Sequence, residues 1–186
     1  ICWGGNPFAS LRPGAYMCYE KHGNASPILD AKERGAKLIV IDPIFTETAA
    51  KADQFIPIKP STDGALANAM ANVIISEDLY DHDFVETWCH GFDEYKMCIE
   101  QCTPEWAEGI TDVPADTIRE LARLYATTEK AALHEGNSLA LHSNCVQAVR
   151  SIGCLRAICG KLDKEGCNVC FPTVVGHPVA VENGNP

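Results

Sequence analysis

The first third of the chain alternates short apolar runs with segments of helical periodicity. One apolar run lies within Lys37–Ile41, and a second lies within Gln54–Ile58. A continuous apolar run of this length, rather than an alternating one, is typical of a strand buried on both faces. The opening residues, Ile1–Trp3, have the same character and lead into a Gly-Gly turn. The pattern therefore predicts three buried strands before residue 60.

Two helices are predicted between these strands and after them. The first covers Pro27–Arg34, with Ser26 in position to cap it and Gly35 at its end. The second begins at Thr62 or Asp63, both of which are good N-terminal residues. Its apolar residues recur at helical spacing, at Leu66, Met70, Val73 and Ile74. The segment Leu11–Asn24 is predicted to be a loop.

The middle third of the chain has helical patterns throughout. The predicted helical segments are Asp81–Cys89, Gly91–Cys102 and Pro114–Thr127, with a further helix start at Thr103-Pro104-Glu105. Strand character returns at Ala131–Leu133, a turn follows at Gly136-Asn137-Ser138, and a long helix is expected over Ser143–Cys159, ended by Gly160.

Strands that alternate with helices favour a parallel sheet, because each parallel connection needs a crossover. The sequence therefore predicts an α/β fold: a Rossmann-like, mainly parallel sheet flanked by helices, with a helical insertion in the middle third. We expect residues 1–166 to form this domain and residues 167–186, which have no clear period, to be an extended tail or the start of the next segment.

Composition and charge exclude two classes of protein. The chain has 186 residues, 46% of them hydrophobic, and a formal net charge of −10. Such a charge repels polyanions, so we expect no nucleic-acid partner. The longest apolar run is strand-sized, so we expect no membrane insertion by this chain. No targeting segment is visible and the sequence starts inside a predicted strand, so we expect a piece of a longer protein of unknown localisation.

The ten cysteines are expected to be reduced thiols. A disulfide scaffold is typical of short chains with weak cores, whereas here several cysteines lie in helical patterns. Cys167-x-x-Cys170 and the pair Cys98 and Cys102 lack a second well-spaced pair for a zinc or iron–sulfur site. Metal ligation is the minority alternative, no metal ligand is assigned, and a reducing or anaerobic setting is favoured.

Candidate chemistry lies where the predicted strands end, since ligands of open parallel sheets bind at that edge. Gly4, Gly5, Asn6 and Pro7 follow the first strand, and the missing Cβ atoms let backbone N–H groups approach an anion. Asp42 and Pro43 follow the second strand, where an acid can bind ribose hydroxyls. Ser61, Thr62 and Asp63 meet a helix start, and Gly136, Asn137 and Ser138 form a fourth turn. The Gly-x-Gly-x-x-Gly fingerprint is absent, which disfavours ordinary NAD binding.

Several segments in this order resemble the molybdopterin oxidoreductase family, the molybdenum or tungsten enzymes related to dimethyl sulfoxide reductase and formate dehydrogenase. They include Trp3-Gly4-Gly5-Asn6-Pro7, Arg34–Pro43, Ile58–Leu66, Leu79–Val85 and Thr103–Ala107. The resemblance covers about residues 1–167. It is strong because of the combination and order of the motifs, each of which is weak by itself.

The resemblance implies that this domain holds one molybdopterin guanine dinucleotide of a cofactor with molybdenum or tungsten. Gly4, Gly5, Asn6 and Pro7 would then contact the pyrophosphate and nucleoside, and Asp42 and Pro43 the ribose. Ser61, Thr62 and Asp63 would meet the guanine, and Gly136, Asn137 and Ser138 would lie toward the pterin. Three positions depart from the family, which usually has Gly in place of Ser61, often Gly in place of Ser138 and often Gln in place of Leu141.

Two functions remain open at this stage. The first is a cofactor-binding domain of a molybdenum or tungsten oxidoreductase, without catalytic residues of its own and silent as an isolated chain. Its partners would be the remaining domains of that enzyme, and the resemblance also allows an iron–sulfur electron-transfer subunit. Iron–sulfur ligands are expected only in flanking sequence. The second function is a stand-alone nucleotide-binding or regulatory α/β module. Whether the chain alone is an enzyme stays undecided, as do its substrate and oligomeric state.

Overall fold

The computed structural model describes residues 1–9 and 25–169. The predicted loop over Leu11–Asn24 and the tail beyond Val169, with Cys170, lie outside the described residues.

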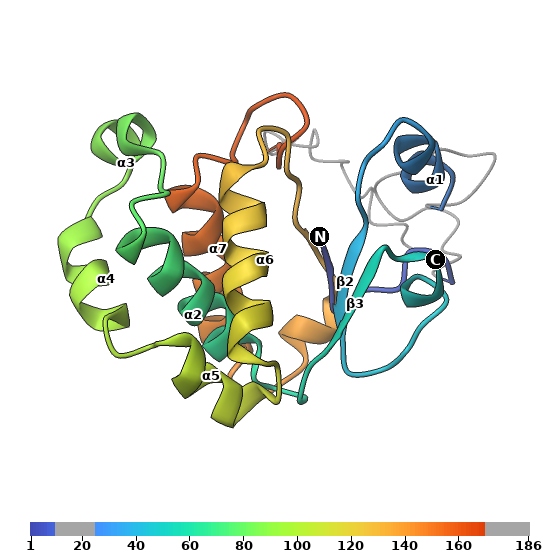
Figure 1. Cartoon of the computed structure of the whole chain (residues 1–186), viewed down its shortest axis with the longest axis horizontal. Coiled ribbons are helices and arrows are strands. Elements are labelled where there is room, and N and C mark those ends of the chain that lie inside the picture. The colour runs from blue at the N-terminus through green and yellow to red at the C-terminus, as the bar shows by residue number, and fades with distance from the viewer. Residues whose placement is uncertain (10–24, 170–186) are drawn as a thin grey trace, which may run out of the picture.

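A parallel sheet of four strands forms the centre of the fold (Figure 1). The strands are β1 (Cys2–Trp3), β2 (Ile39–Asp42), β3 (Gln54–Pro57) and β4 (His134–Glu135). Their spatial order is β3-β2-β1-β4, and Cys2 is in register with Val40 on one side and with His134 on the other. Because β1 and β2 pair in parallel across a long connection, the predicted α/β architecture is confirmed.

The fourth strand lies later in the sequence than its apolar run predicts. Leu133 is fully buried, but its N–H donates to Asn168 Oδ1 (2.9 Å) and its carbonyl accepts from Asn168 Nδ2 (2.8 Å). A side-chain amide thus satisfies the backbone groups of Leu133. Ladder bonds to β1 are made instead by the N–H groups of His134 and Gly136, which donate to Ile1 O and Trp3 O, both at 2.8 Å. The apolar run thus predicted correctly that Leu133 is buried. The residues that form the strand are those that pair with β1, namely His134 and Glu135.

Seven α-helices and two 3₁₀ turns lie among the described residues. The α-helices are α1 (Ala25–Glu33), α2 (Asp63–Ser76), α3 (His82–Trp88), α4 (Phe92–Ile99), α5 (Pro104–Thr111), α6 (Ala115–Thr127) and α7 (Cys145–Ile158). The 3₁₀ turns are η1 (Ala49–Lys51) and η2 (Asn137–Ala140). Helices α2 to α6 all lie between β3 and β4, which confirms the predicted helical insertion. Helices α2, α6 and α7 lie on one side of the sheet and α1 lies on the other (Figure 1).

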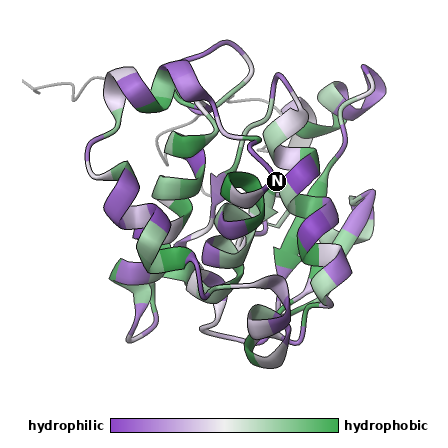
Figure 2. Ribbon diagram, turned by 60° about the vertical axis from the view of Figure 1, so that its left-hand side comes forward, coloured by the Kyte–Doolittle hydropathy of each residue, from purple (hydrophilic) through white to green (hydrophobic). Residues whose placement is uncertain are grey.

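The strands bury alternate residues on the two faces of the sheet. Ile39 and Ile41 belong to the large core that β2 shares with the helices, whereas Val40 packs on the other face with Cys2 and the partly buried Ile28 of α1. This alternation follows from the two-residue period of a strand. Figure 2 shows hydrophobic residues on the strands and on the inward sides of the helices.

Helix α2 is the centre of the large core. It packs against α5, α6 and α7, and Leu66, Ala67, Met70, Ala71 and Ile74 are all fully buried. The sequence pattern predicted one apolar face, but the helix is enclosed on most sides, as is typical of a helix that is apolar all round. The start of α2 also differs from the prediction. Thr62 precedes the helix but makes no side-chain cap, because its hydroxyl donates to Lys59 O at 2.6 Å.

Two short helices do have side-chain caps. Thr103 Oγ1 accepts from the N–H of Trp106 (3.2 Å) at the start of α5, and Asp81 Oδ1 accepts from the N–H of Phe84 (2.9 Å) at the start of α3. Ser26, expected to cap α1, instead lies inside that helix, which begins at Ala25.

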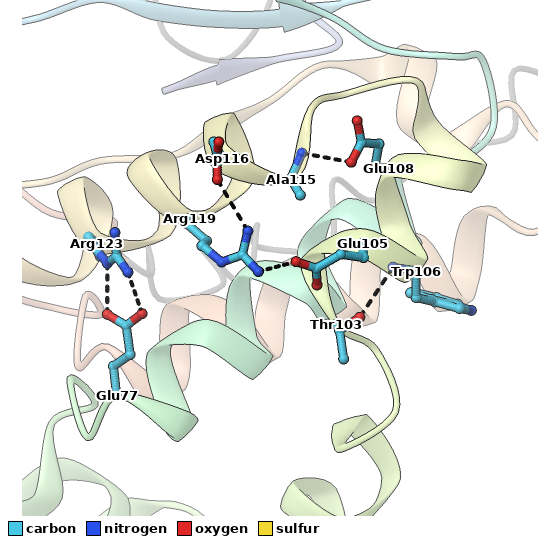
Figure 3. A network of polar contacts seen from close by, with 9 residues as sticks. All are labelled: Glu77, Thr103, Glu105, Trp106, Glu108, Ala115, Asp116, Arg119 and Arg123. Carbon is cyan, nitrogen blue, oxygen red and sulfur yellow. Dashed lines mark hydrogen bonds and ion pairs between the residues drawn. The ribbon is translucent and has the colours of Figure 1, made fainter.

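Ion pairs join α6 to its neighbours on the outer surface. Arg123 forms a two-point pair with Glu77 at the end of α2, with N–O distances of 2.8 and 2.7 Å. Arg119 contacts Glu105 of α5 and Asp116 of its own helix (Figure 3). These side chains come from helices and not from strand ends, so we assign the cluster to helix packing. Within the described residues, no helix has the length and apolar character needed to cross a membrane.

Candidate functional site

The four predicted turns meet at one edge of the sheet, which we call the carboxyl edge: Gly4–Pro7, Asp42-Pro43, Ser61–Asp63 and Gly136–Ser138. The N–H of Gly4 donates to Ile41 O at 2.8 Å, so the first turn is bonded to the end of β2. The hydroxyl of Ser138 donates to Gly4 O, so the fourth turn is bonded to the first. The indole of Trp3 in β1 reaches Asp63. The turns are therefore connected to one another and not scattered over separate faces.

Three glycines allow the first and fourth turns to touch. Gly4 has a φ of +61°, which favours glycine, and a Cβ there would meet Ser138 Oγ at 2.6 Å. A Cβ on Gly136 would lie 1.8 Å from Gly4 O, and one on Gly5 would lie 3.2 Å from the Cα of Gly136. The missing side chains of these residues thus face the neighbouring turn, which gives them a packing role in addition to the predicted approach to an anion.

The side chain of Asn6 is bonded to the segment that follows β2. Its Nδ2 donates to Glu47 Oε2 and its Oδ1 accepts from Thr48 Oγ1, both at 2.7 Å. Thr48 is fully buried, and its hydroxyl oxygen also accepts from the N–H of Phe8 at 3.2 Å. Asn6 therefore fixes the turn after β1 against the chain that leaves β2, with Pro7 buried beside it. The sequence pattern gave no sign of the roles of Glu47 and Thr48.

The Asp42 carboxyl lies half-buried at the end of β2. Its Oδ1 accepts from the N–H of Ile44 at 2.9 Å. Burial raises the pKa of Asp42, the bond from Ile44 opposes this, and the negative charge of Asp63 raises the pKa further. The two acids of the carboxyl edge are thus close enough to interact electrostatically. Pro43 is exposed beside them.

Ser61 lies in a tight turn between β3 and α2. The N–H of Thr62 donates to Lys59 O at 3.3 Å, Pro60 is at the second position and Ser61, at the third, has a φ of +67°. These are the features of a type II turn, whose third position favours glycine. The carbonyl of Ser61 also accepts from Asn144 Nδ2 at 2.8 Å, which ties the turn to the start of α7. Ser61 therefore forms the turn with its own side chain in a left-handed conformation.

Asp63 is the most enclosed acid of the carboxyl edge, with a relative exposure of 6%. Its Oδ1 accepts from the indole N–H of Trp3 at 2.8 Å. Trp3 was named only as part of a sequence motif. The sequence could have indicated this role, because a tryptophan in a buried strand needs an acceptor for its N–H. Which acceptor it finds, 60 residues along the chain, depends on the fold.

The fourth turn leads into η2. Asn137 and Ser138 are its first residues and are exposed, whereas Leu139 is buried. Leu141, which follows, is 80% exposed. At this end of the sheet Arg156 Nη2 lies 2.6 Å from Glu135 Oε1 and donates to Leu133 O at 2.9 Å. Burial raises the pKa of Glu135 in spite of Arg156.

Within residues 1–9 and 25–169, no group of three or more histidine, cysteine or acidic side chains is arranged to hold a metal ion. Cys98 and Cys102 are free thiols. Cys167 is free and buried, and its predicted companion Cys170 lies outside the described residues. The carboxyl edge instead offers carboxylates and hydroxyls, which suit the N–H and O–H groups of a nucleotide.

Comparisons with known proteins point to one family. A family model described as molybdopterin oxidoreductase matches residues 1–181. Formate dehydrogenase H of Escherichia coli (strain K12) is 43% identical over 145 residues, covering 78% of this chain and 20% of that protein. Dimethyl sulfoxide reductase DmsA of the same organism is 34% identical over 189 aligned residues, covering 90% of this chain and 22% of that protein.

A solved structure agrees with the sequence relatives. Acetylene hydratase from Pelobacter acetylenicus has a TM-score of 0.69 and 40% sequence identity to this chain, covering 75% of it and 20% of the hydratase chain. The chain thus spans about a fifth of the length of the relatives it matches. The relatives carry names of different reactions, so the similarity concerns what these proteins share and not one substrate.

Proposed function

Because this chain belongs to the molybdopterin oxidoreductase family, we propose that its carboxyl edge holds one molybdopterin guanine dinucleotide of a molybdenum or tungsten oxidoreductase. The guanine dinucleotide form of the cofactor and the residues that bind it are parts of this proposal. When bound, the cofactor supplies the electron-transfer chemistry, whereas the protein binds and orients it.

The observation that carries the proposal is the enclosed carboxylate of Asp63 at the carboxyl edge. An ionised carboxylate only accepts hydrogen bonds, and guanine presents a ring N–H and an amino group side by side. Adenine has no ring N–H on the corresponding edge. An enclosed acceptor pair at this position therefore favours guanine, and Asp63 stands at the N-terminus of α2, where the helix dipole stabilises negative charge.

The other turns have groups that fit the rest of a dinucleotide. Asp42 can accept from ribose hydroxyls at the end of β2, beside Pro43. Ser61 and Thr62 precede the N-terminus of α2, and the N–H groups at a helix N-terminus attract polar and anionic partners. The turn of Gly4, Gly5, Asn6 and Pro7 would contact the pyrophosphate and nucleoside, and Gly136, Asn137 and Ser138 would lie toward the pterin. No catalytic residue is proposed in this chain.

Substrate contacts and the conversion itself would then depend on further domains of the enzyme. We propose those domains as partners of this chain, with an iron–sulfur electron-transfer subunit as a further one. Because the chain matches about a fifth of each relative, we do not expect it to catalyse a reaction alone.

The test is calorimetric titration of the 186-residue chain with GDP and with ADP. We expect GDP to bind at least about tenfold more tightly, because one good two-point hydrogen-bonded pair is worth about 1–3 kcal/mol of base discrimination. Asp63→Asn should remove that preference, since an amide has one acceptor oxygen and places a donor against guanine. Asp93→Asn on the exposed surface of α4 is the matched control and should leave both affinities unchanged.

Equal binding of GDP and ADP, or an unchanged preference in Asp63→Asn, would contradict the proposal. Tighter binding of ADP than of GDP would favour the alternative, a nucleotide-binding regulatory module without a redox role.

A further inference from the structure

The hydrogen bond between Trp3 and Asp63 joins two enclosed residues from distant parts of the sequence. The indole Nε1 lies 2.8 Å from Asp63 Oδ1, Trp3 has a relative exposure of 0% and Asp63 one of 6%. The other two tryptophans of the chain, Trp88 and Trp106, are 75% and 40% exposed. Trp3 alone among them is thus placed where its N–H has no access to water and where an acceptor is needed.

This bond fixes the orientation of the Asp63 carboxylate. The indole is rigid and held by the large core, and a bond to one oxygen restrains rotation about the terminal carbon–carbon bond of Asp63. A carboxylate has about four acceptor sites, of which the indole occupies one. Within residues 1–9 and 25–169, Oδ2 accepts no hydrogen bond, and it is not fully buried. Oδ2 can therefore accept from a ligand, and Oδ1, which keeps a second acceptor site beside the indole bond, can accept as well.

Recognition of two neighbouring donors depends on this orientation. Hydrogen bonds weaken steeply as the donor angle departs from linearity, so a carboxylate that rotates freely can meet one donor well and the other poorly. A site built around two fixed acceptors rejects a ligand that lacks one donor, because an enclosed acceptor is then left unpaired.

We propose that Trp3 is a positioning residue for guanine specificity: its N–H holds the Asp63 carboxylate in the plane in which both oxygens can accept from a 2-amino-6-oxopurine. This inference rests on the proposed function, in which Asp63 meets the guanine. It adds that selectivity for the purine amino group depends on Trp3 of β1 as well as on Asp63.

The test compares GDP with inosine diphosphate, which differs only in lacking the 2-amino group. For the wild-type chain, we expect GDP to bind at least about tenfold more tightly than inosine diphosphate. In Trp3→Phe, the ratio of the two dissociation constants should fall severalfold toward one. Trp106→Phe, at a partly exposed tryptophan of α5, is the matched control and should leave the ratio unchanged.

The ratio separates positioning from a loss of stability. A partly unfolded variant has a smaller binding-competent fraction, which weakens the apparent affinity for both nucleotides by the same factor. If Trp3→Phe does not fold, site-specific incorporation of 3-benzothienyl-alanine at position 3 keeps the shape of the side chain and removes only the N–H. The same fall in the ratio is expected for that variant.

The two proposals fail in different ways. The ratio of the two dissociation constants could stay at its wild-type value in Trp3→Phe and yet be lost in Asp63→Asn. That result would overturn the role of Trp3 and leave the proposed function intact. A wild-type chain that binds GDP and ADP alike overturns the proposed function and this inference with it.

Discussion

A Cβ atom on Gly136 would lie 1.8 Å from the carbonyl oxygen of Gly4. The turn after β4 thus rests directly on the turn after β1, although 132 residues (136 − 4) separate the two positions in the chain. The same pair of turns is bonded by the hydroxyl of Ser138, which donates to Gly4 O, and by the N–H of Gly136, which donates to Trp3 O at 2.8 Å. The two turns therefore leave no room for a side chain at position 136.

Gly136→Ala should destabilise the chain by about 3 kcal/mol, the upper part of the range for overpacking. The added methyl would meet backbone atoms of Gly4 and Gly5, which cannot move aside by changing a rotamer. Urea denaturation followed by circular dichroism measures the change. Gly153→Ala is the control: it lies within α7 with no atom near the added Cβ, and should stabilise the helix by about 0.5–1 kcal/mol. A Gly136→Ala variant as stable as wild type would contradict the described contact.

Ser61→Gly should stabilise the chain by about 0.5 kcal/mol. A left-handed conformation costs an ordinary residue about 1–2 kcal/mol, and this relief exceeds the entropy cost of glycine, about 0.4–1 kcal/mol. Ser61 has a φ of +67°, and its hydroxyl has no bond described within residues 1–9 and 25–169. Ser61→Ala removes the same hydroxyl without relieving the backbone and should be close to neutral. Thermal unfolding of the three proteins gives the comparison, and equal shifts for both variants would exclude backbone strain as the cause.

Asp81 provides a test of pH dependence. Its carboxylate accepts from Lys164 Nζ (2.9 Å) and from the N–H of Phe84 (2.9 Å), and these two bonds, that from Lys164 first, lower its pKa. A lowered pKa contributes stability above the unfolded value of 3.8, and this contribution is lost as the pH falls through the folded value. Asp81→Asn keeps the cap on α3 but not the charge. Wild type should therefore exceed Asp81→Asn in stability at pH 7 and 5, with a difference that shrinks below pH 4.

Asp81→Ala removes the cap as well and should be about 1 kcal/mol less stable than Asp81→Asn at all these pH values. Urea denaturation at pH 7, 5 and 3 measures both variants. A difference between wild type and Asp81→Asn that grows on acidification would contradict the assigned direction of the pKa shift.

The cysteines should differ widely in reactivity in the folded chain. Burial raises the pKa of Cys2 to about 11 and that of Cys159 to about 12. A pKa of about 11 leaves roughly one thiol in a thousand ionised at pH 8, and only the thiolate is nucleophilic. Among the eight cysteines within residues 1–9 and 25–169, Cys98 is exposed on α4 and should react with iodoacetamide first, with Cys2 and Cys159 among the last. Peptide mass mapping at timed intervals checks the order, and unfolding of the chain in concentrated urea should abolish it.

The sequence pattern located most elements because their signals are local. The apolar run of β2 and the helical spacing of Leu66, Met70 and Val73 in α2 need only neighbouring residues to be read. Strand β2 lies within two residues of its predicted bounds, and α2 begins at Asp63, one of its two predicted starts. Strand β4 is different. Its apolar run at Ala131–Leu133 precedes the paired residues His134 and Glu135, because pairing is decided by the hydrogen bonds of β1 and by the Asn168 side chain.

The candidate site likewise has features that the local sequence predicts and contacts that it does not predict. Glycines, acids and hydroxyls at the ends of predicted parallel strands are enough to place the carboxyl edge, since parallel strands all end on one side of a sheet. The amino-acid sequence by itself therefore determined the fold class and the turns that meet. Only the tertiary structure decided that Trp3 bonds Asp63, that Asn6 is held by Glu47 and Thr48, and that Gly136 touches Gly4. Each of these contacts joins residues far apart in the chain, and a hydrogen bond or a close approach depends on positions in space that no local pattern encodes.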